Sequence, residues 1–155
     1  MELVTAILWI HALAGAAWVA ACVCFVVAGI APTAGSEEQR SFALRAAPKI
    51  SGFSIMAAVL VLITGGLNLG LAGVARRFQF SLQFGFVLAA KVVLFVAMAF
   101  TLGRITRIIA SLRSSPEASD NVRVQVAMSD ATRLHTLIAL MGGIALLLGL
   151  WLMGS

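Results

Sequence analysis

The chain has 155 residues, of which 61% are hydrophobic and only 11% are charged, and its formal net charge is +5. Soluble domains carry about a quarter charged residues, so the composition excludes an ordinary soluble domain and favours an integral membrane protein. The basic residues lie between apolar blocks. They are therefore better explained as orientation signals at a lipid bilayer than as a surface for nucleic acid.

Four apolar blocks predict an all-α fold. Each block holds about the 20 residues that an α-helix needs to cross about 30 Å of hydrocarbon. The blocks are apolar on every face, whereas the helices of a soluble bundle keep one polar face. We therefore predict a single membrane domain over residues 1–155, a multi-pass four-helix bundle in a bacterial inner membrane. The predicted helices cover residues 3–30, 50–73, 84–103 with an extension to 113, and 134–153.

The basic residues between these helices predict the orientation of the chain. The first connection carries three Lys or Arg residues and the third carries five, against two in the second. Because basic residues accumulate in cytoplasmic connections, we expect the first and third connections in the cytoplasm and both termini on the outer, periplasmic side. Ser129 or Asp130 is expected to cap the fourth helix at its cytoplasmic start.

Three polar side chains interrupt three different helices: His11 in the first, Asn68 in the second and Lys91 in the third. With the predicted topology all three lie in the outer half of the bilayer, and His11 is about 12 Å deep at 1.5 Å per residue. Polar groups inside a membrane usually face the bundle interior and mark a functional site, so we predict that the three converge. Each also has a plainer explanation. Lys91 could extend to the membrane surface, and Asn68 or His11 could simply bond to a neighbouring helix.

The surroundings of His11 suggest a cofactor. Gly15 and Trp18 follow it along one helical stripe, and a glycine one turn from an imidazole leaves room for a flat macrocycle. Histidine is a common axial ligand of haem iron, so we predict that His11 ligates haem b, with Gly15 and Trp18 beside it. Met98 lies seven residues after Lys91 on one stripe and is a candidate second metal ligand. The stripe below His11 would also suit ordinary helix packing.

His135 lies at the start of the fourth predicted helix, on the cytoplasmic side. With this topology, His135 and His11 cannot ligate the same iron. We expect His135 to be an interfacial residue, with a second haem or an anionic group beside Arg133 as the alternatives. Cys22 and Cys24 point to different sides of one helix and make a poor metal pair.

Three stretches resemble a known family. They are "LWIHALAGAAWVA", "RSFALRAAPKISGFSIMAAVLVLITGGLNLG", which contains the pair Thr64-Gly65, and "FGFVLAAKVVLFVAMAFTLGR". The chain thereby resembles the copper-resistance protein D-like (CopD) superfamily, which includes the HemJ-type protoporphyrinogen oxidases. The resemblance implies a four-helix core with a functional histidine and lysine, here His11 and Lys91, together with b-type haem and oxidation of protoporphyrinogen. The chain lacks the histidine that HemJ-like proteins tend to carry just before the lysine.

Three functions are open at this stage. The first is a haem b redox protein that performs membrane electron transfer or oxidises a tetrapyrrole or quinone, with Lys91 as the catalytic residue that holds an anionic substrate or a haem propionate. The second is copper handling or transport, with His11 and methionines as ligands. The third is a non-catalytic accessory subunit that packs into a homo-oligomer or a larger membrane complex through Gly and Ala faces.

Overall fold

The computed structural model describes residues 2–30, 36–75, 77, 79, 81–114 and 121–154. Four long helices dominate it, and each lies in a segment that is long and apolar enough to cross a membrane, as predicted. A short helix and a π-helical turn lead into the second of them. The elements are α1 (Glu2–Ile30), α2 (Glu37–Ser41), η1 (Phe42–Ala46), α3 (Ala47–Ala75), α4 (Leu82–Ser114) and α5 (Asn121–Gly154).

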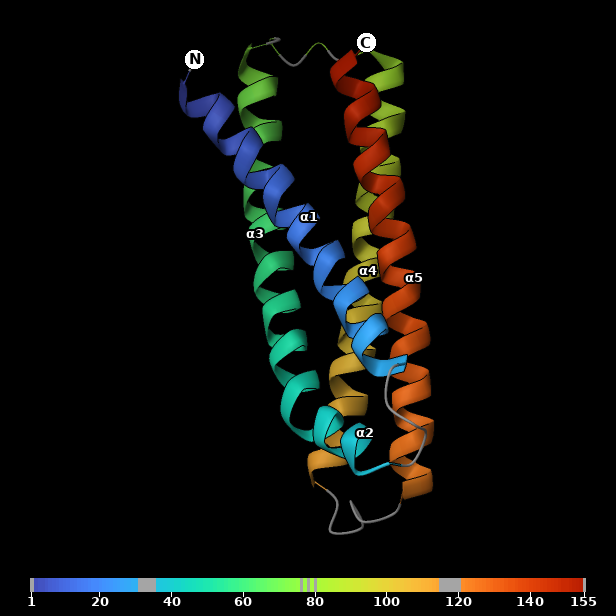
Figure 1. Cartoon of the computed structure of the whole chain (residues 1–155). Helices are drawn as coiled ribbons and strands as arrows, with labels where there is room; N and C mark the ends of the chain where they lie inside the picture. Colours follow the sequence, from blue (N-terminus) through green and yellow to red (C-terminus); the bar gives the residue numbers. More distant parts are fainter. Residues whose placement is uncertain are drawn as a thin grey trace.

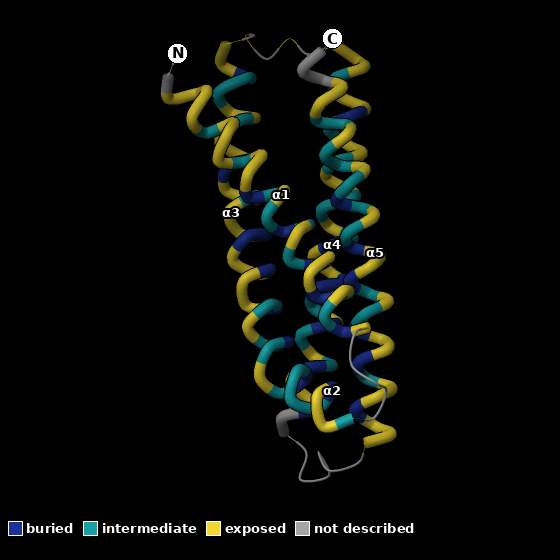
Figure 2. Tube along the Cα trace, viewed as in Figure 1, coloured by how far each residue is buried: buried dark blue, intermediate teal, exposed yellow. Residues whose placement is uncertain are grey.

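The long helices run side by side, with the start of α1 and the end of α5 at the same end of the bundle (Figure 1). We call this the terminal end, and the opposite end the α2 end. Helices are the expected element because every backbone N–H and C=O is then satisfied within the segment, which a hydrocarbon environment demands. Many residues on the outside of the bundle are exposed (Figure 2), and Leu, Val, Ile and Phe are frequent among them. The outer surface is therefore compatible with lipid contact.

The π-helical turn η1 has a local cause in Pro48. Proline has no N–H, so it cannot donate to the carbonyl four residues earlier, and its ring clashes with that carbonyl. Just before it, the backbone N–H of Ala47 instead bonds to the carbonyl of Phe42, five residues back. This wider turn lets the chain continue from α2 into α3 without a break.

One predicted helix boundary and one predicted cap need correction at the α2 end. α5 begins at Asn121, well before residue 134, so Ser129 and Asp130 lie exposed inside a helix and the predicted cap is wrong. The extension of the third helix is confirmed, because α4 continues to Ser114. Both helices continue past the apolar blocks because their ends bury apolar side chains. These are Ile105, Ile109 and Leu112 of α4 and Val124, Met128 and Ala131 of α5.

The buried core lies mainly in the half of the bundle toward the α2 end (Figure 2). Phe25 of α1 is at its centre, with its ring edge-on to Phe42 at 5.4 Å and stacked on the imidazole of His135 at 3.7 Å. Toward the terminal end, α1 leans onto α3 while α4 and α5 stay together (Figure 1). In that half, polar side chains can therefore come from the pair α1 and α3 and from the pair α4 and α5.

Gly142 allows α5 to approach α1 and α4 closely. A Cβ built on Gly142 would lie 2.5 Å from Cγ2 of Val19 and 3.2 Å from Cε of Met98, whereas one built on Gly143 meets no atom within 4 Å. We expect Gly142→Ala to lower the unfolding free energy by about 1–3 kcal/mol, because Val19 is stiff and cannot easily turn away. Thermal unfolding in detergent measures this effect.

The matched control is Gly143→Ala, which should leave the melting temperature nearly unchanged. The double variant Gly142→Ala/Val19→Ala should recover part of the loss, because the two residues are in contact and their effects should not add. Equal melting temperatures for Gly142→Ala and Gly143→Ala would contradict the close approach.

Candidate functional site

In the half of the bundle toward the terminal end, the best-defined polar contact joins α1 to α3. Nδ1 of His11 lies 3.0 Å from Oγ1 of Thr64, and that hydroxyl donates to the carbonyl of Leu60 at 2.6 Å. Since the hydroxyl proton is already used, Thr64 accepts from His11 and the imidazole proton is assigned to Nδ1. The other ring nitrogen, Nε2, then carries a lone pair, as a metal-ligating or proton-accepting histidine requires.

Gly65 explains how the imidazole approaches α3 so closely. A Cβ built at this position would lie 3.1 Å from Cε1 of His11 and 3.6 Å from its Nδ1. Any larger residue would therefore push against the ring edge. Thr64 and Gly65 together fix both the position and the tautomer of His11, which is how the second layer around a functional histidine usually acts.

Lys91 reaches toward α5 from α4. Its Nζ would lie 3.1 Å from a Cβ built on Gly149, so the glycine makes space for the ammonium group. Gly149 lies one turn beyond Leu146, the residue that faces Gly15 of α1, so Lys91 and His11 lie at about the same level of the bundle. Within the described ranges no hydrogen bond or ion pair satisfies the ammonium group. Two predicted site residues thus share one region, and one of them is an uncompensated cation.

Asn68 lies one helical turn from Thr64, on the same face of α3. Its Nδ2 atom is buried and finds no hydrogen-bond partner in the part of the chain that the structure describes. An orphaned buried amide costs about 1–3 kcal/mol, so such a group calls for an explanation, for example a ligand or water that completes it. A bond from Asn68 to a neighbouring helix, the plainer explanation, is not among its described contacts.

The other predicted site residues contribute to helix packing. A Cβ on Gly15 would lie 3.7 Å from Cδ2 of Leu146, so this glycine faces α5. Trp18 is buried and packs edge-on against Phe95, with the ring centroids 5.9 Å apart. Both residues therefore make ordinary helix-packing contacts, which was the alternative explanation of the stripe.

Met98 is buried beside Gly142, which also faces Val19. Val19 lies eight residues after His11, or about 12 Å along α1. Met98 is therefore two turns away from the imidazole, too far to ligate a metal atom that His11 binds in this arrangement.

His135 occupies the opposite half of the bundle. It is fully buried and stacked on Phe25, which is about 21 Å along α1 from His11. Its Nδ1 donates to the carbonyl of Ala131 at 2.8 Å, while its Nε2 is buried without a partner among the described residues. We expected an interfacial residue, and the structure adds that its side chain lies inside the bundle. Buried aromatic packing holds this histidine in the core.

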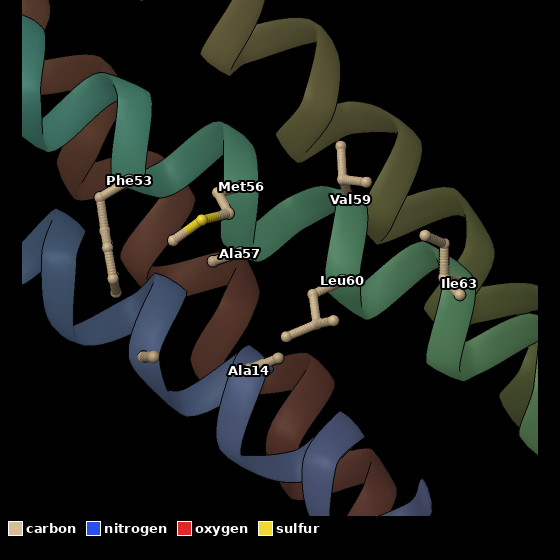
Figure 3. Close-up of a pocket in the computed structure, with 8 residues that line it drawn as sticks. Ala14, Phe53, Met56, Ala57, Val59, Leu60 and Ile63 are labelled. Atoms are coloured by element: carbon tan, nitrogen blue, oxygen red, sulfur yellow. The ribbon is translucent and has the colours of Figure 1, made fainter.

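An open apolar groove of about 440 Å³ lies between α1 and α3. Its α1 side is formed by Ala14 and Ala17, and its α3 side by apolar side chains between residues 53 and 63. Figure 3 shows Phe53 extending toward α1 and Ala14 facing Leu60. The groove ends one turn from the His11–Thr64 hydrogen bond. No signal in the sequence marks it, because its lining looks like any other apolar helix surface.

No family model, no curated protein and no solved structure matches this chain. Across the described ranges, no group of three or more His, Cys, Asp and Glu side chains is arranged to hold a metal ion. The site that remains consists of a single imidazole with a free lone pair, an uncompensated ammonium group and an orphaned amide. Such a set suits a large cofactor or substrate that brings its own anionic groups.

Proposed function

We propose that the chain is a haem b-binding redox protein of the bacterial inner membrane, which performs electron transfer or oxidises a tetrapyrrole or quinone. The observation that supports this most is the His11–Thr64 hydrogen bond. It leaves Nε2 of an intramembrane histidine as a lone-pair donor at about the level of the cation Lys91 in the bundle. A single axial imidazole is sufficient protein ligation for haem iron.

The residues fit such a cofactor in two further ways. Haem b carries two propionates, and Lys91 and Asn68 offer an ammonium group and an amide N–H without partners among the described residues. An ammonium–carboxylate pair inside a membrane is only weakly screened, so it would hold a propionate or an anionic substrate strongly. The haem would supply one-electron chemistry, while Thr64 would orient His11 and Lys91 would neutralise the anion.

The proposal is tested by the visible spectrum of the protein purified in detergent, oxidised and reduced. A Soret band with a haem-to-protein ratio near one is the expected result. A colourless protein with stoichiometric copper would instead favour copper handling. A colourless, copper-free protein that co-purifies with another membrane protein would favour the accessory subunit.

We also propose that both termini lie on the outer side. Exposed basic side chains concentrate at the α2 end, where Arg45, Lys49, Arg123 and Arg133 lie, against Arg77 at the terminal end. This excess is expected for the cytoplasmic end of a membrane protein. Fusions at the C-terminus should therefore give active alkaline phosphatase and dark green fluorescent protein. The opposite pair of results would invert the topology and place His11 in the inner half of the membrane.

Thr64 offers a test of the second layer around His11. In Thr64→Val the imidazole loses its acceptor, so we expect haem affinity to fall by about 10–100-fold, the usual effect of removing an orienting partner. Thr64→Ser keeps the hydroxyl and should bind haem nearly as the wild type does. Haem titration of the apoprotein measures both. Equal affinity for the valine and serine variants would show that the hydrogen bond does not orient the ligand.

A further inference from the structure

The core toward the α2 end contains buried polar atoms that have no hydrogen-bond partner among the described residues. They are Nε2 of His135 on α5 and the hydroxyl oxygens of Ser51 and Ser54 on α3. His135 and Ser54 are fully buried, and Ser51 is only 3% exposed. An unpartnered polar atom in a core is costly, so three of them in one region call for an explanation.

The two serines differ from other hydroxyl groups on the long helices. Several of those donate to a carbonyl three or four residues earlier in their own helix, namely Thr64, Thr101, Thr106, Ser111 and Thr136. Such a bond is the usual local partner for a hydroxyl in a helix. Within the part of the chain that the structure describes, Ser51 and Ser54 do not make it. Their hydroxyls are therefore left for a partner from outside α3.

The histidine and the serines lie at about one level of the bundle. His135 stacks on Phe25, which lies fourteen residues beyond His11 on α1. His11 is level with Thr64, and Ser51 lies thirteen residues before Thr64 on α3, which runs in the opposite direction. Ser51 is therefore level with His135, and the second serine is less than one turn farther toward the terminal end.

A pocket of about 250 Å³ between α1, α2 and α5 adjoins this level from the α2 end. Its polar lining consists of Gln39, Gln125, Ser129 and Thr132. Gln125 is exposed, so the pocket reaches the surface, and Thr132 lies about one turn before His135 on α5. A Cβ built on Gly29, which also lines the pocket, would lie 3.9 Å from Cε1 of Phe25. The ring that stacks on His135 therefore also borders the pocket.

We propose that water enters from this pocket and occupies a site formed by Nε2 of His135 and the hydroxyls of Ser51 and Ser54. Nδ1 of His135 donates to the carbonyl of Ala131, so Nε2 is a hydrogen-bond acceptor, and each hydroxyl can both donate and accept. Water complements this set, because it also donates and accepts. Buried waters typically make about three hydrogen bonds to polar atoms that would otherwise have no partner.

The water would place a proton donor at the lone pair of a buried imidazole. Histidines in such positions belong to the proton relays of membrane proteins, so the site gives protons from the α2 end a place inside the bundle. It goes beyond the proposed haem function and does not depend on it, since Phe25 and His135 lie about 21 Å along α1 from His11.

The bound water is tested by NMR on protein labelled with isotopic histidine in lipid nanodiscs. The chain has two histidines, so His135→Gln assigns the signals. We expect magnetisation transfer from water to the protons on Cε1 and Cδ2 of His135, the carbons that flank Nε2. Transfer should fall several-fold in Ser51→Ala/Ser54→Ala and stay unchanged in Ser111→Ala, which removes an exposed hydroxyl from α4. Absent transfer in the wild type, or equal transfer in the two-serine variant, would overturn the site.

Thermal unfolding gives a second readout. Removing one partner of a hydrated cluster leaves the others incompletely bonded, so Ser54→Ala should lower the melting temperature by a few degrees. Ser111→Ala should leave it unchanged. A Ser54→Ala variant that melts at or above the wild-type temperature would show that this hydroxyl had no partner to lose, which contradicts the water site.

The entry route is tested at the mouth of the pocket. Gln125→Trp fills the mouth, whereas Val126→Trp adds the same ring to an exposed neighbouring position outside the lining. Transfer from bulk water to His135 should fall several-fold in the first variant and stay unchanged in the second. Equal transfer in the two variants would mean that water does not enter through this pocket.

Discussion

In the His11→Ala variant we expect the Soret band to be lost while the helical content and elution profile stay those of the wild type. The alanine cannot ligate iron, and the nearest other described imidazole, His135, lies about 21 Å of helix away. Losing the ligand itself should cost more than losing an orienting partner, so we expect haem affinity to fall more than about 100-fold. Absorbance and the haem-to-protein ratio of the purified variant give the measurement.

His135→Gln is the matched control, because it removes the second imidazole from the other half of the bundle. It should retain the Soret band, with a lower melting temperature from the lost stacking on Phe25. In His11→Gly, added imidazole should restore the band by entering the space that the side chain leaves. A band that survives His11→Ala but disappears in His135→Gln would move the haem to the α2 end.

The sequence is sufficient to predict the spanning helices because lipid imposes a simple requirement, a long apolar run with few or no charges. The same requirement explains why the start of α5 was predicted too late. The apolar run measures the membrane part of a helix, so it could not reveal that α5 starts at Asn121 and pairs with α4 beyond the apolar block. That pairing depends on buried residues such as Ile109 and Met128, whose partners are not adjacent in the sequence.

The residues of the candidate site could be chosen from the sequence, but most of their contacts could not. Rarity alone singled out His11, Asn68 and Lys91, since polar groups inside a membrane are costly. A uniformly apolar helix, however, gives no signal for which face meets which neighbour. The contact of Thr64 with His11 and that of Gly149 with Lys91 therefore became visible only when the rotation of each helix was known. A mid-helix threonine followed by a glycine is the one local hint that a neighbouring side chain approaches there.

Lys91→Met should leave the fold intact and lower the reduction potential of the haem. A cation near the iron favours the reduced form, because reduction decreases the positive charge on the metal. At an effective dielectric of about 20 and a separation of about 10 Å, the loss of one charge changes the potential by on the order of 50 mV. We also expect weaker haem binding, since the variant no longer offers an ammonium group to a propionate. Redox titration of the visible spectrum measures the first effect and haem titration the second.

Lys91→Arg keeps the charge and should keep most of the wild-type potential. Gly149→Val should reproduce part of the shift, because its side chain would occupy space within 3.1 Å of Nζ and displace the ammonium group. Gly143→Val adds the same side chain to α5 where a Cβ meets no atom within 4 Å, and it should change neither quantity. If Lys91→Met changes neither the potential nor the haem affinity, the ammonium group has no anionic partner in the site. Lys91 would then be a lysine that extends along the apolar bundle to the membrane surface.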